Sequence, residues 1–361
     1  MTQVKTLAAP LAPGATIGIL GGGQLGRMLA AAAARLGLKC CIFSDADDAP
    51  AFDIAFSHIH AAYDDRKALE DFAAASDVVT YEFENIPAPT CQWLSERVPL
   101  LPNVKALATT QDRILEKTLA VEEGLNVPPF FAVSSPEEAA SAFAKLNRPC
   151  VMKTRRFGYD GKGQANVSSA EEAAAAYARL NAPAILEAFV DFSFEASIIA
   201  ARGRDGSFAA FDPAENVHEH HILRRSTVPS RLSPEQGTEA KAIARKLCEA
   251  LDYVGVFAVE LFVAKDGSLL INETAPRVHN SGHWTIEACE TSQFEQHIRA
   301  VAGWPLGSPA RHSDVVMENV LGFEAADYLK LAARGALHLY GKKEMRQGRK
   351  MGHLTMLKPK A

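Results

Sequence analysis

A predicted β-hairpin near residue 266 is the feature that most constrains the fold of this chain. Residues 256–264 and 269–273 are rich in apolar and β-branched side chains, and the pair Asp266-Gly267 lies between them. An Asp-Gly pair between two apolar runs is among the strongest short-range signals for a tight hairpin turn. We therefore expect two adjacent antiparallel strands, whose turn decides which residues face each other.

The predicted register places two glutamates side by side. If the Asp-Gly pair forms the loop, Lys265 faces Ser268, and five steps further outward Glu260 lies opposite Glu273; a four-residue loop gives the same pairing. Directly opposed side chains lie roughly 4.5–5.5 Å apart, and like charges there are unfavourable. The pairing therefore predicts a cation, and Mg²⁺ fits because it takes one or two carboxylates together with water and phosphate oxygens. The alternative is that one glutamate is twisted into solvent.

A polar loop follows the second strand directly and is interrupted by Pro276 and Gly282. Its polar side chains are Arg277, His279, Asn280, Ser281 and His283. Loops at strand ends carry function more often than they carry the core. We therefore expect this loop to belong to the functional site.

Length, charge and cysteine content limit the class of protein. The chain has 361 residues, which suits two or three domains, and its formal net charge of −5 argues against a general nucleic-acid binder. Its six cysteines form no Cys-x-x-Cys pair, which favours a reduced, cytoplasmic protein over a disulfide framework or a zinc module. No apolar run approaches the ~20 residues of a membrane span. Residues 1–13 lack a signal-peptide pattern and are expected to be a disordered lead-in.

A glycine-rich motif near the N-terminus predicts a βαβ unit. Residues 16–20 form a short apolar strand, residues 21–27 read GGGQLGR, and an alanine-rich helix leads to a strand that closes with Asp45. This is the spacing of a dinucleotide-binding fingerprint, so an NAD-dependent dehydrogenase is one candidate. The alternative is that the glycines only permit a tight turn that brings a helix N-terminus close to some other anion.

A second buried-type strand, residues 77–85, ends in polar side chains. These are Tyr81, Glu82, Glu84 and Asn85. Polar groups beyond the carboxyl ends of parallel strands contact ligands in open α/β sheets. A capped turn before Pro87 is an equally good interpretation.

The middle of the chain combines a helix with a second glycine-rich loop. Residues 111–123 form a predicted amphipathic helix that carries Arg113 and Lys117 four apart on one face. A strand ending in Lys153 precedes residues 155–164, RRFGYDGKGQ, in which three glycines are flanked by cations. Backbone N–H groups of such a loop can approach phosphates, although the spacing is not that of a Walker A motif. A surface hairpin with solvated charges is the alternative.

Two further clusters are distinctive. Residues 218–221 read HEHH, but they lack the spacing of a helical zinc-binding pair and have no cysteine nearby, so a transition-metal site is not favoured. Residues 340–353 read YGKKEMRQGRKMGH and contain five cations against Glu344. The interleaved glycines and the strand that follows favour a structured phosphate-binding turn over a free basic tail.

Together these motifs resemble the ATP-grasp superfamily and, within it, the N5-carboxyaminoimidazole ribonucleotide synthetase family of purine biosynthesis. The resemblance rests on residues 22–28 (GGQLGRM), 158–164 (GYDGKGQ), 272–284 (NETAPRVHNSGHW) and 348–353 (GRKMGH). These motifs extend over almost the whole chain in order. The run that follows Glu273 is the most specific of them, and the first glycine motif is the least.

The resemblance implies an α/β and α+β chain with the ATP-grasp fold. Residues 14–110 would form a Rossmann-like N-terminal domain that helps bind a ribonucleotide rather than a dinucleotide. Residues 111–190 would supply a linker helix and a small lid domain. Residues 191–361 would form the large domain, with a mixed or antiparallel sheet and a C-terminal basic phosphate-binding segment.

The resemblance also implies roles for individual residues, and Glu260 and Glu273 would hold Mg²⁺ or Mn²⁺. The residues implied in binding the cosubstrate ATP are Arg113, Lys153, Gly158, Tyr159, Asp160, Gly161, Lys162, Gly163, Gln164, Glu187, Ala188, Phe189, Val190, Glu195, His218, Asn272 and Glu273. The residues implied in catalysis are Arg277, His279 and Tyr159. The residues implied in substrate binding are Gln24, Leu25, Tyr159, Lys162, Arg277, Asn280, Ser281, Lys343, Arg346, Arg349 and Lys350.

The activity that the resemblance implies is ATP-dependent carboxylation of 5-aminoimidazole ribonucleotide with bicarbonate, through carboxyphosphate, with release of ADP and phosphate. The implied partners are these small molecules and a second copy of the chain in a homodimer, without nucleic acid or membrane. One departure is Ala275, because many ATP-grasp relatives have a metal-binding asparagine there. The alternatives are a sister ATP-grasp carboxylate-amine ligase with another acid or amine, or an NAD-dependent dehydrogenase. The latter would leave the glutamate pair and the basic segment unexplained.

Overall fold

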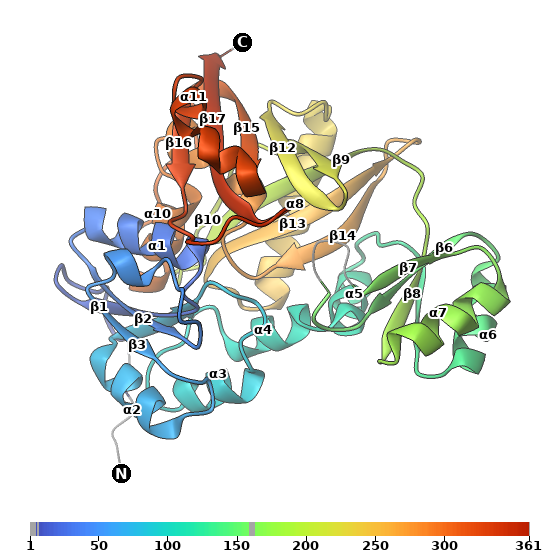
Figure 1. Ribbon diagram of the computed structural model, residues 1–361, viewed down its shortest axis with the longest axis horizontal. Helices are drawn as coiled ribbons and strands as arrows, with labels where there is room; N and C mark the ends of the chain where they lie inside the picture. Colours follow the sequence, from blue (N-terminus) through green and yellow to red (C-terminus); the bar gives the residue numbers. More distant parts are fainter. Residues whose placement is uncertain (1–4, 6, 159–162, 361) are drawn as a thin grey trace.

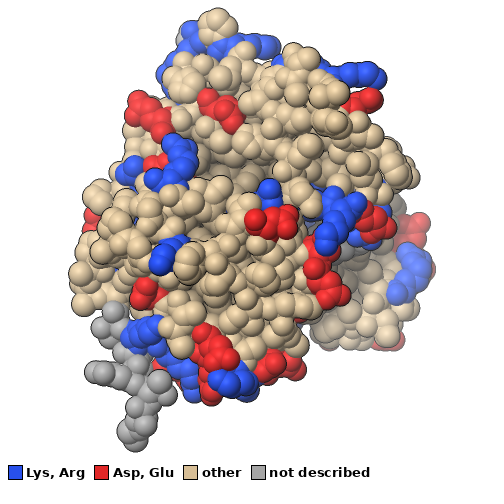
Figure 2. Space-filling view, turned by 60° about the vertical axis from the view of Figure 1, so that its left-hand side comes forward, with Lys and Arg blue, Asp and Glu red and all other residues tan. Residues whose placement is uncertain are grey.

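The computed structural model describes residues 5, 7–158 and 163–360, and within these residues the chain forms three β-sheets (Figure 1). A parallel N-terminal sheet lies at one end of the molecule and a small sheet with two helices lies at the other (Figure 1). A large antiparallel sheet connects them. Figure 2 shows that, on one face, basic side chains lie beside acidic ones with broad neutral areas between.

The N-terminal sheet has the strand order β3-β2-β1-β4, with every neighbouring pair parallel. Its elements are β1 (Thr16–Leu20), α1 (Gln24–Arg35), β2 (Lys39–Ser44), β3 (Ser57–His60), α2 (Arg66–Ala75) and β4 (Val78–Tyr81). Parallel strands that are covered on both faces read as continuous apolar runs. The central strands β1 and β2 are buried in this way over most of their length and pair in parallel, so the expected βαβ unit is present.

The small sheet has the order β5-β8-β6-β7 and is antiparallel. The elements leading to it are α3 (Ala88–Ser95), α4 (Val104–Thr110) and α5 (Arg113–Glu122). Its own elements are β5 (Phe130–Val133), α6 (Pro136–Leu146), β6 (Cys150–Thr154), β7 (Gln164–Val167), α7 (Ala170–Leu180) and β8 (Ala184–Ala188). Ser135 and Ser169 cap α6 and α7 by accepting backbone hydrogen bonds. The helices and the sheet bury a separate apolar cluster.

The large sheet has the order β14-β13-β9-β11-β12-β15-β17-β16, with β10 beside β9. Its strands are β9 (Phe192–Arg202), β10 (Phe208–Ala210), β11 (Ala214–Glu219), β12 (Ile222–Val228), β13 (Gly255–Ala264), β14 (Leu269–Ala275), β15 (Ser313–Leu321), β16 (Ala336–Leu339) and β17 (Lys350–Pro359). Its helices are α8 (Pro234–Ala250), α9 (Thr285–Ala288), α10 (Gln293–Ala302) and α11 (Tyr328–Ala332). Helix α8 packs on one face of β9 and β13, and α10 packs on both strands as well as on α1.

The N-terminal and large sheets share a core across α10. His297 of α10 is fully buried, and its Nδ1 accepts a hydrogen bond from the Val256 N–H at 3.1 Å. Because Nδ1 accepts, the proton of the neutral ring is on Nε2, which lies 2.8 Å from Thr80 Oγ1 of β4. These two parts of the molecule are therefore joined by packing and by a buried hydrogen-bond relay, whereas the small sheet has its own core.

The predicted pairing of Glu260 with Glu273 is confirmed, but the turn between the strands differs from the prediction. Ala264 and Ser268 close a three-residue loop, in which Gly267 has a positive φ of 87°. Near the loop, the observed register therefore differs from the predicted one by one residue, and Leu261 faces Ile271 instead of Asn272. A β-bulge at Asn272 then shifts the register back, and Glu260 faces Glu273.

Residues 285–302 do not form one continuous helix, because a break separates α9 from α10. Ser292 begins α10 by accepting a hydrogen bond from the Glu295 N–H. Cys289 pairs with Arg311 in an isolated bridge. A capping serine and a strand-like pairing compete with helical hydrogen bonds here and end α9.

The expected disordered lead-in also differs from the structure over residues 7–13. Leu7 and Leu11 pack against the core that contains α1 and α10. The Leu11 N–H donates to Ala302 O at 2.8 Å, and Trp304 Nε1 donates to Leu11 O at 2.7 Å. Apolar contacts and paired backbone groups thus hold this segment in place.

Candidate active site

A cleft of about 630 Å³ lies where the three sheets meet. Many of the residues that the sequence singled out line it. These are Arg113, Lys153, Gly158, Gly163, Gln164, Phe189, Glu195, His218, Glu260, Asn272, Glu273, Arg277, His279, Asn280 and Lys350. Residues more than 200 positions apart in the chain are thereby brought to one place, and Tyr159, Asp160, Gly161 and Lys162 lie outside the described residues.

Two carboxylates face each other on the hairpin, with the side chain of Glu260 largely buried and that of Glu273 about two-fifths exposed. Burial, and then the negative charge of Glu273, raise the pKa of Glu260 to about 7. Burial also raises the pKa of Glu273, but Arg113, whose Nη1 lies 3.1 Å from Glu273 Oε2, and Lys153 outweigh it and lower this pKa overall. The charge of Glu260 is therefore the poorly compensated one.

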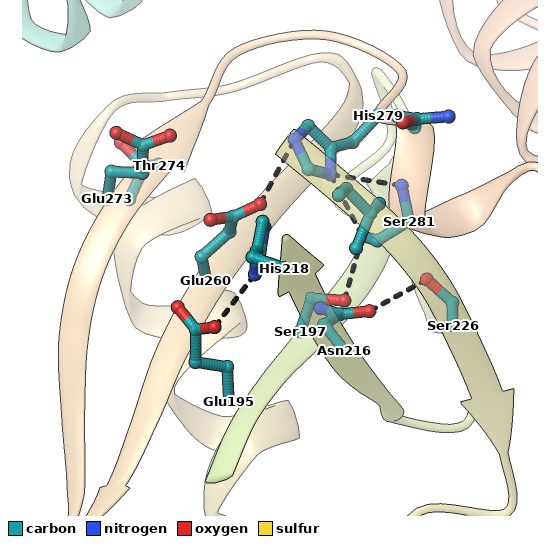
Figure 3. Close-up of polar contacts among 12 residues, drawn as sticks. Glu195, Ser197, Asn216, His218, Ser226, Glu260, Glu273, Thr274, His279 and Ser281 are labelled. Carbon is teal, nitrogen blue, oxygen red and sulfur yellow. Dashed lines mark hydrogen bonds and ion pairs between the residues drawn. The ribbon is translucent and has the colours of Figure 1, made fainter. Parts of the chain in front are cut away.

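His279 faces Glu260 from the loop that follows β14 (Figure 3). Its Nδ1 accepts a hydrogen bond from the Ser281 N–H at 3.3 Å, and the Ser281 hydroxyl lies 2.8 Å from the same nitrogen. Burial, and then the charge of Arg277, hold the pKa of His279 well below its usual value, so the ring is neutral. The proton of the neutral ring is therefore on Nε2, which lies 3.3 Å from Glu260 Oε1.

Ser281 does not line the cleft, although it was expected to bind substrate. Its side chain is fully buried, and its hydroxyl accepts a hydrogen bond from Ser197 Oγ of β9 at 2.8 Å (Figure 3). Gln293 holds the backbone of His279 from the other side, since its Oε1 accepts from the His279 N–H at 2.9 Å and its Nε2 donates to the His279 carbonyl at 2.7 Å. Ser281 and Gln293 therefore hold the loop from the side of the core.

Arg277 forms an ion pair with Glu84, which follows β4 of the N-terminal sheet. Burial lowers the pKa of Arg277, but Glu84 outweighs it and raises this pKa, so the guanidinium is a fixed positive charge. Burial raises the pKa of Glu84, and Arg277 lowers it further than burial raises it. The cation therefore stands where the N-terminal and large sheets meet, at the polar end of the strand that the sequence singled out.

Glu195 and His218 form a second pair beside the hairpin. His218 Nδ1 lies 2.7 Å from Glu195 Oε2, and both side chains are about one-fifth exposed (Figure 3). Burial lowers the pKa of His218, but the hydrogen bond to Glu195 outweighs it and raises this pKa. Two neighbours of His218, His220 and His221, have positive φ angles in the turn between β11 and β12.

Glu187 of β8 lies in a buried group with two lysines. Lys153 Nζ is 2.6 Å from one of its oxygens, and Lys117 Nζ is 3.3 Å from the other. Burial raises the pKa of Glu187, but Lys117 and Lys153 outweigh it and lower this pKa to about 2. Glu187 and Ala188 are buried, whereas Phe189 is half exposed and lines the cleft.

The sequence identified Arg113 and Lys117 on one face of helix α5, but it missed Glu116 and the packing of this face against β14. Arg113 contacts Glu273, Glu116 accepts hydrogen bonds from the N–H and hydroxyl of Thr274, and Lys117 contacts the strand next to them. The spacing of these charges, at positions i, i+3 and i+4, places them on one face. That spacing was visible in the sequence, but what the face packs against was not.

The first glycine motif does not leave space for a dinucleotide. The carboxylate of Glu82 accepts hydrogen bonds from the N–H groups of Gly23 at 2.8 Å and Gly26 at 3.1 Å, at the N-terminus of α1. A Cβ at Gly21 would lie 2.6 Å from Glu82 Oε1, so the glycines admit this side chain. The dehydrogenase interpretation is therefore wrong, and the helix N-terminus binds an anion that belongs to the chain itself.

The basic segment lies beside the N-terminal sheet. Lys343 Nζ is 3.6 Å from Asp48, Arg346 Nε is 3.1 Å from Glu344, and Arg349 donates to the Glu344 carbonyl. Within the described residues, the cleft lining includes Lys350 but not these three cations. Of the residues expected at the ribonucleotide, Gln24 begins α1 and Leu25 packs in the core.

Glu260 and Glu273 fit a hard divalent cation. Both are oxygen donors on opposed positions, and the raised pKa of Glu260 shows that their charges are not fully compensated. Within the described ranges there is no group of three or more His, Cys, Asp and Glu side chains that could hold a metal. Mg²⁺ binds through one or two carboxylates and phosphate oxygens, so this donor set suits it better than it suits zinc.

No helix in the described part of the chain is long and apolar enough to cross a membrane.

Three family models match successive parts of the chain. Residues 14–111 match a ribonucleotide synthetase preATP-grasp domain, residues 118–294 match an ATP-grasp domain, and residues 315–361 match a phosphoribosylaminoimidazole carboxylase C-terminal domain. The first match agrees with the occupied glycine motif in excluding a dinucleotide-binding domain. The chain therefore has the ATP-grasp fold that the resemblance implied.

Known proteins resemble the chain over nearly its whole length. The N5-carboxyaminoimidazole ribonucleotide synthase of Brucella melitensis is 54% identical over 97% of this chain and 98% of its own length. An N5-carboxyaminoimidazole ribonucleotide synthetase solved with ADP has a TM-score of 0.93 at 44% identity, covering 97% of this chain and 94% of its own. The Aspergillus clavatus enzyme solved with ADP and 5-aminoimidazole ribonucleotide has a TM-score of 0.90 at 30% identity, covering 96% and 95%.

Proposed function

The chain belongs to the N5-carboxyaminoimidazole ribonucleotide synthase family of the ATP-grasp superfamily, and from that premise we propose how its cleft carries out the reaction. The enzyme is an ATP-dependent ligase of purine biosynthesis. It joins bicarbonate to the amine of 5-aminoimidazole ribonucleotide and converts ATP into ADP and phosphate. The observation that carries this function is the 54% identity to the Brucella melitensis enzyme over 97% of the chain.

The chemical difficulty of this reaction is that bicarbonate is a poor electrophile, because hydroxide is a poor leaving group. Attack of bicarbonate on the γ-phosphate of ATP gives carboxyphosphate, whose leaving group is phosphate. The amine then attacks this species or the CO₂ that it releases. Phosphoryl transfer depends on positioning and charge neutralisation more than on covalent catalysis, so the fixed charges of the cleft are the relevant groups.

The ATP end of the cleft is assigned to α5, the small sheet and β9. Arg113 and Lys153 bind the phosphates, Glu195 accepts hydrogen bonds from the ribose with His218 beside it, and Phe189 contacts the base. Glu260 and Glu273 hold Mg²⁺ or Mn²⁺, which when bound neutralises charge on the phosphates. Glu187 orients Lys153 through the 2.6 Å contact between them.

The bicarbonate end of the cleft is assigned to Arg277 and His279. Arg277 supplies a fixed positive charge for an anion, because its pKa lies well above neutrality and Glu84 holds the side chain in place. His279 supplies a neutral imidazole whose Nε2–H can donate to bicarbonate or carboxyphosphate. The resemblance adds Tyr159 and the 158–164 loop, of which residues 159–162 lie outside the described residues.

The ribonucleotide is assigned to the junction of the N-terminal sheet and the basic segment. Lys343, Arg346 and Arg349 bind its 5′-phosphate, which calls for fixed cations. Gln24 and Leu25 contribute backbone groups at the start of α1, and Asn280 and Lys350 reach it from the cleft wall. The chain acts in the cytoplasm as a homodimer. The dimer is tested by measuring the mass in solution by light scattering, which should be twice the chain mass of 38.9 kDa.

The first test of the function is steady-state ADP release with MgATP, with and without the ribonucleotide and with bicarbonate present or stripped out. We expect ADP release to need both additions and labelled bicarbonate to appear in the product. ATP turnover that does not depend on the ribonucleotide would instead favour a sister ATP-grasp ligase with another amine.

Arg277→Ala should abolish product formation while the protein stays folded. Turnover near the wild-type rate would refute the assignment of Arg277 to the bicarbonate end of the cleft.

A further inference from the structure

Helix α5 holds the strand that carries Glu273, and we propose that Lys117 is a positioning residue for the metal site. The inference rests on the proposed function, because it assumes that Glu260 and Glu273 hold the metal. Lys117 is fully buried and does not line the cleft among the described residues. Its effect would therefore pass through the backbone of β14 and not through direct contact with substrate.

The β-bulge at Asn272 decides which face of the sheet Glu273 occupies. Between the turn and the bulge the register pairs Leu261 with Ile271. Continued without a bulge, that register would place Asn272 opposite Glu260 and Glu273 opposite Val259. Directly opposed residues share a face, and Val259 is fully buried in the core beneath the sheet. The extra residue therefore turns Glu273 from the core face to the cleft face.

Lys117 supplies the partners that the bulged backbone needs. Its Nζ donates to the carbonyls of Ile271 at 2.8 Å and Asn272 at 2.6 Å. Successive carbonyls of a regular strand point to opposite sides, so two that meet one ammonium group mark the local distortion of a bulge. Buried carbonyls without partners would be costly, and Lys117 satisfies both.

The ammonium group of Lys117 makes three contacts. Two of its N–H donors go to the two carbonyls, and its charge forms an ion pair with Glu187, whose Oε1 lies 3.3 Å away without hydrogen-bond geometry. The other oxygen of Glu187 contacts Lys153. Lys117 thus connects the strand that carries Glu273 to the side chain that orients Lys153, so one residue sets the position of both charges.

The other α5 contacts strengthen this hold on the strand. Glu116 accepts hydrogen bonds from the N–H and hydroxyl of Thr274, and Arg113 contacts Glu273 itself. Among the described strands β14 is the edge of the large sheet, and the Ile271 N–H donates to Asn126 O just after the helix. Helix α5 and the segment after it therefore cover an edge whose backbone groups would otherwise be open to rearrangement.

The first test needs no ligand. Hydrogen exchange of the peptide 269–276 is compared in the wild type, in Lys117→Met and in Leu69→Ala, which removes buried volume from the separate N-terminal core. We expect exchange in this peptide to rise by about tenfold or more in Lys117→Met and to change little in Leu69→Ala once the two are matched for global stability. An equal rise in both variants would overturn the proposal.

The second test measures the metal directly by calorimetry. The quantity compared is the ADP dissociation constant without Mg²⁺ divided by the constant with Mg²⁺, which reports how much the metal strengthens binding. This ratio should fall by about 10- to 100-fold in Lys117→Met, as for other residues that orient metal ligands. Leu69→Ala should keep the wild-type ratio. A purely structural role would lower the melting temperature of both variants and leave both ratios unchanged, and that result would overturn the proposal.

Lys117→Arg covers the case in which Lys117→Met does not fold. A guanidinium keeps the charge, but its planar fork cannot reproduce the contacts of a compact ammonium, so the ratio should fall in the same direction by less. A wild-type ratio in this variant would count against the proposal. If Mg²⁺ did not change the ADP dissociation constant of the wild type, the assignment of the metal to Glu260 and Glu273 would fail. The hydrogen-exchange test would still decide whether Lys117 holds the strand.

Discussion

Glu187 and Glu260 are both buried carboxylates of this cleft region, and their environments have opposite effects. Glu187 has two lysines within 3.3 Å, and the pKa of its carboxyl falls to about 2. Glu260 faces another carboxylate and a neutral imidazole, and its pKa rises to about 7. Burial alone would raise the pKa of both groups, so the balance of neighbouring charge decides the difference.

This comparison separates a group that supports the fold from a group that is available for function. The carboxylate of Glu187 is neutralised within the protein and orients Lys153. That of Glu260 retains charge that the protein does not neutralise, at the position where a cation would be bound. Functional sites commonly keep such unfavourable arrangements at some expense of stability. The two glutamates therefore predict opposite responses to the same substitution.

The largest expected effect is on activity. Glu260→Gln should lower the rate of ribonucleotide carboxylation by about 10²–10³-fold, because it removes one of two carboxylates at the phosphates. Glu187→Gln should lower it less, since that side chain acts through Lys153. Steady-state ADP release at saturating MgATP measures both variants, and a greater loss in Glu187→Gln would reverse the comparison.

The next effect is on stability. Glu187→Gln should lower the free energy of unfolding by about 3 kcal/mol at pH 7, which corresponds to the shift of its pKa from 4.5 to about 2. The folded-state pKa is depressed, so this stabilisation is complete above pH 4.5 and is lost as the pH falls toward 2. Urea unfolding at several pH values should show the gap between variant and wild type closing on acidification. A gap that persists unchanged would argue against the ion pairs as its source.

A smaller effect of opposite sign is expected for the other glutamate. Glu260→Gln should raise the stability of the metal-free protein by about 1–2 kcal/mol at pH 8, because it removes a largely buried charge that faces the like charge of Glu273. Thermal unfolding without divalent cations measures the change. The variant should also lose the stabilisation that Mg²⁺ with ADP gives the wild type. A melting temperature that falls as far as that of Glu187→Gln would mean that Glu260 also supports the fold.

The smallest effect concerns a charge far from both glutamates. Lys343→Ala should raise the KM for the ribonucleotide by about tenfold and leave the KM for ATP unchanged, because a charge-assisted phosphate contact is worth about 1.5 kcal/mol or more. Lys330 is a matched control, since it is also an exposed lysine paired with an aspartate, Asp327. Equal changes in both KM values would remove Lys343 from the 5′-phosphate site.

The sequence predicted the elements of this fold better than it predicted their contacts. Turn chemistry and apolar periodicity located the hairpin strands, and the opposed glutamates were predicted from them. The turn nevertheless has three residues, where two or four were predicted, and the bulge at Asn272 restored the pairing. A bulge depends on what satisfies the distorted backbone, and here that is Lys117, 155 positions earlier in the chain.

The candidate site was predicted unevenly for the same reason. Arg277 and His279 were identified because polar residues cluster in a loop after a strand, and they line the cleft. Ser281 belongs to that cluster but points into the core, since position in a loop does not give the direction of a side chain. Glu84, Ser197 and Gln293 act from other elements, and only tertiary packing brings them to the loop.

Glu82 gives the N-terminal domain an internal mimic of a phosphate group. Two oxygens of one carboxylate occupy the helix N-terminus that a dinucleotide would need, and they come from a residue 59 positions after Gly23. The backbone N–H groups of Gly23 and Gly26 are thus already hydrogen-bonded to Glu82. Gly21 and Gly23 remain necessary because side chains at their positions would collide with this carboxylate. In this chain, the acidic residue at the end of a neighbouring strand fills the helix N-terminus when the protein folds, so a glycine fingerprint alone does not establish a vacant nucleotide site.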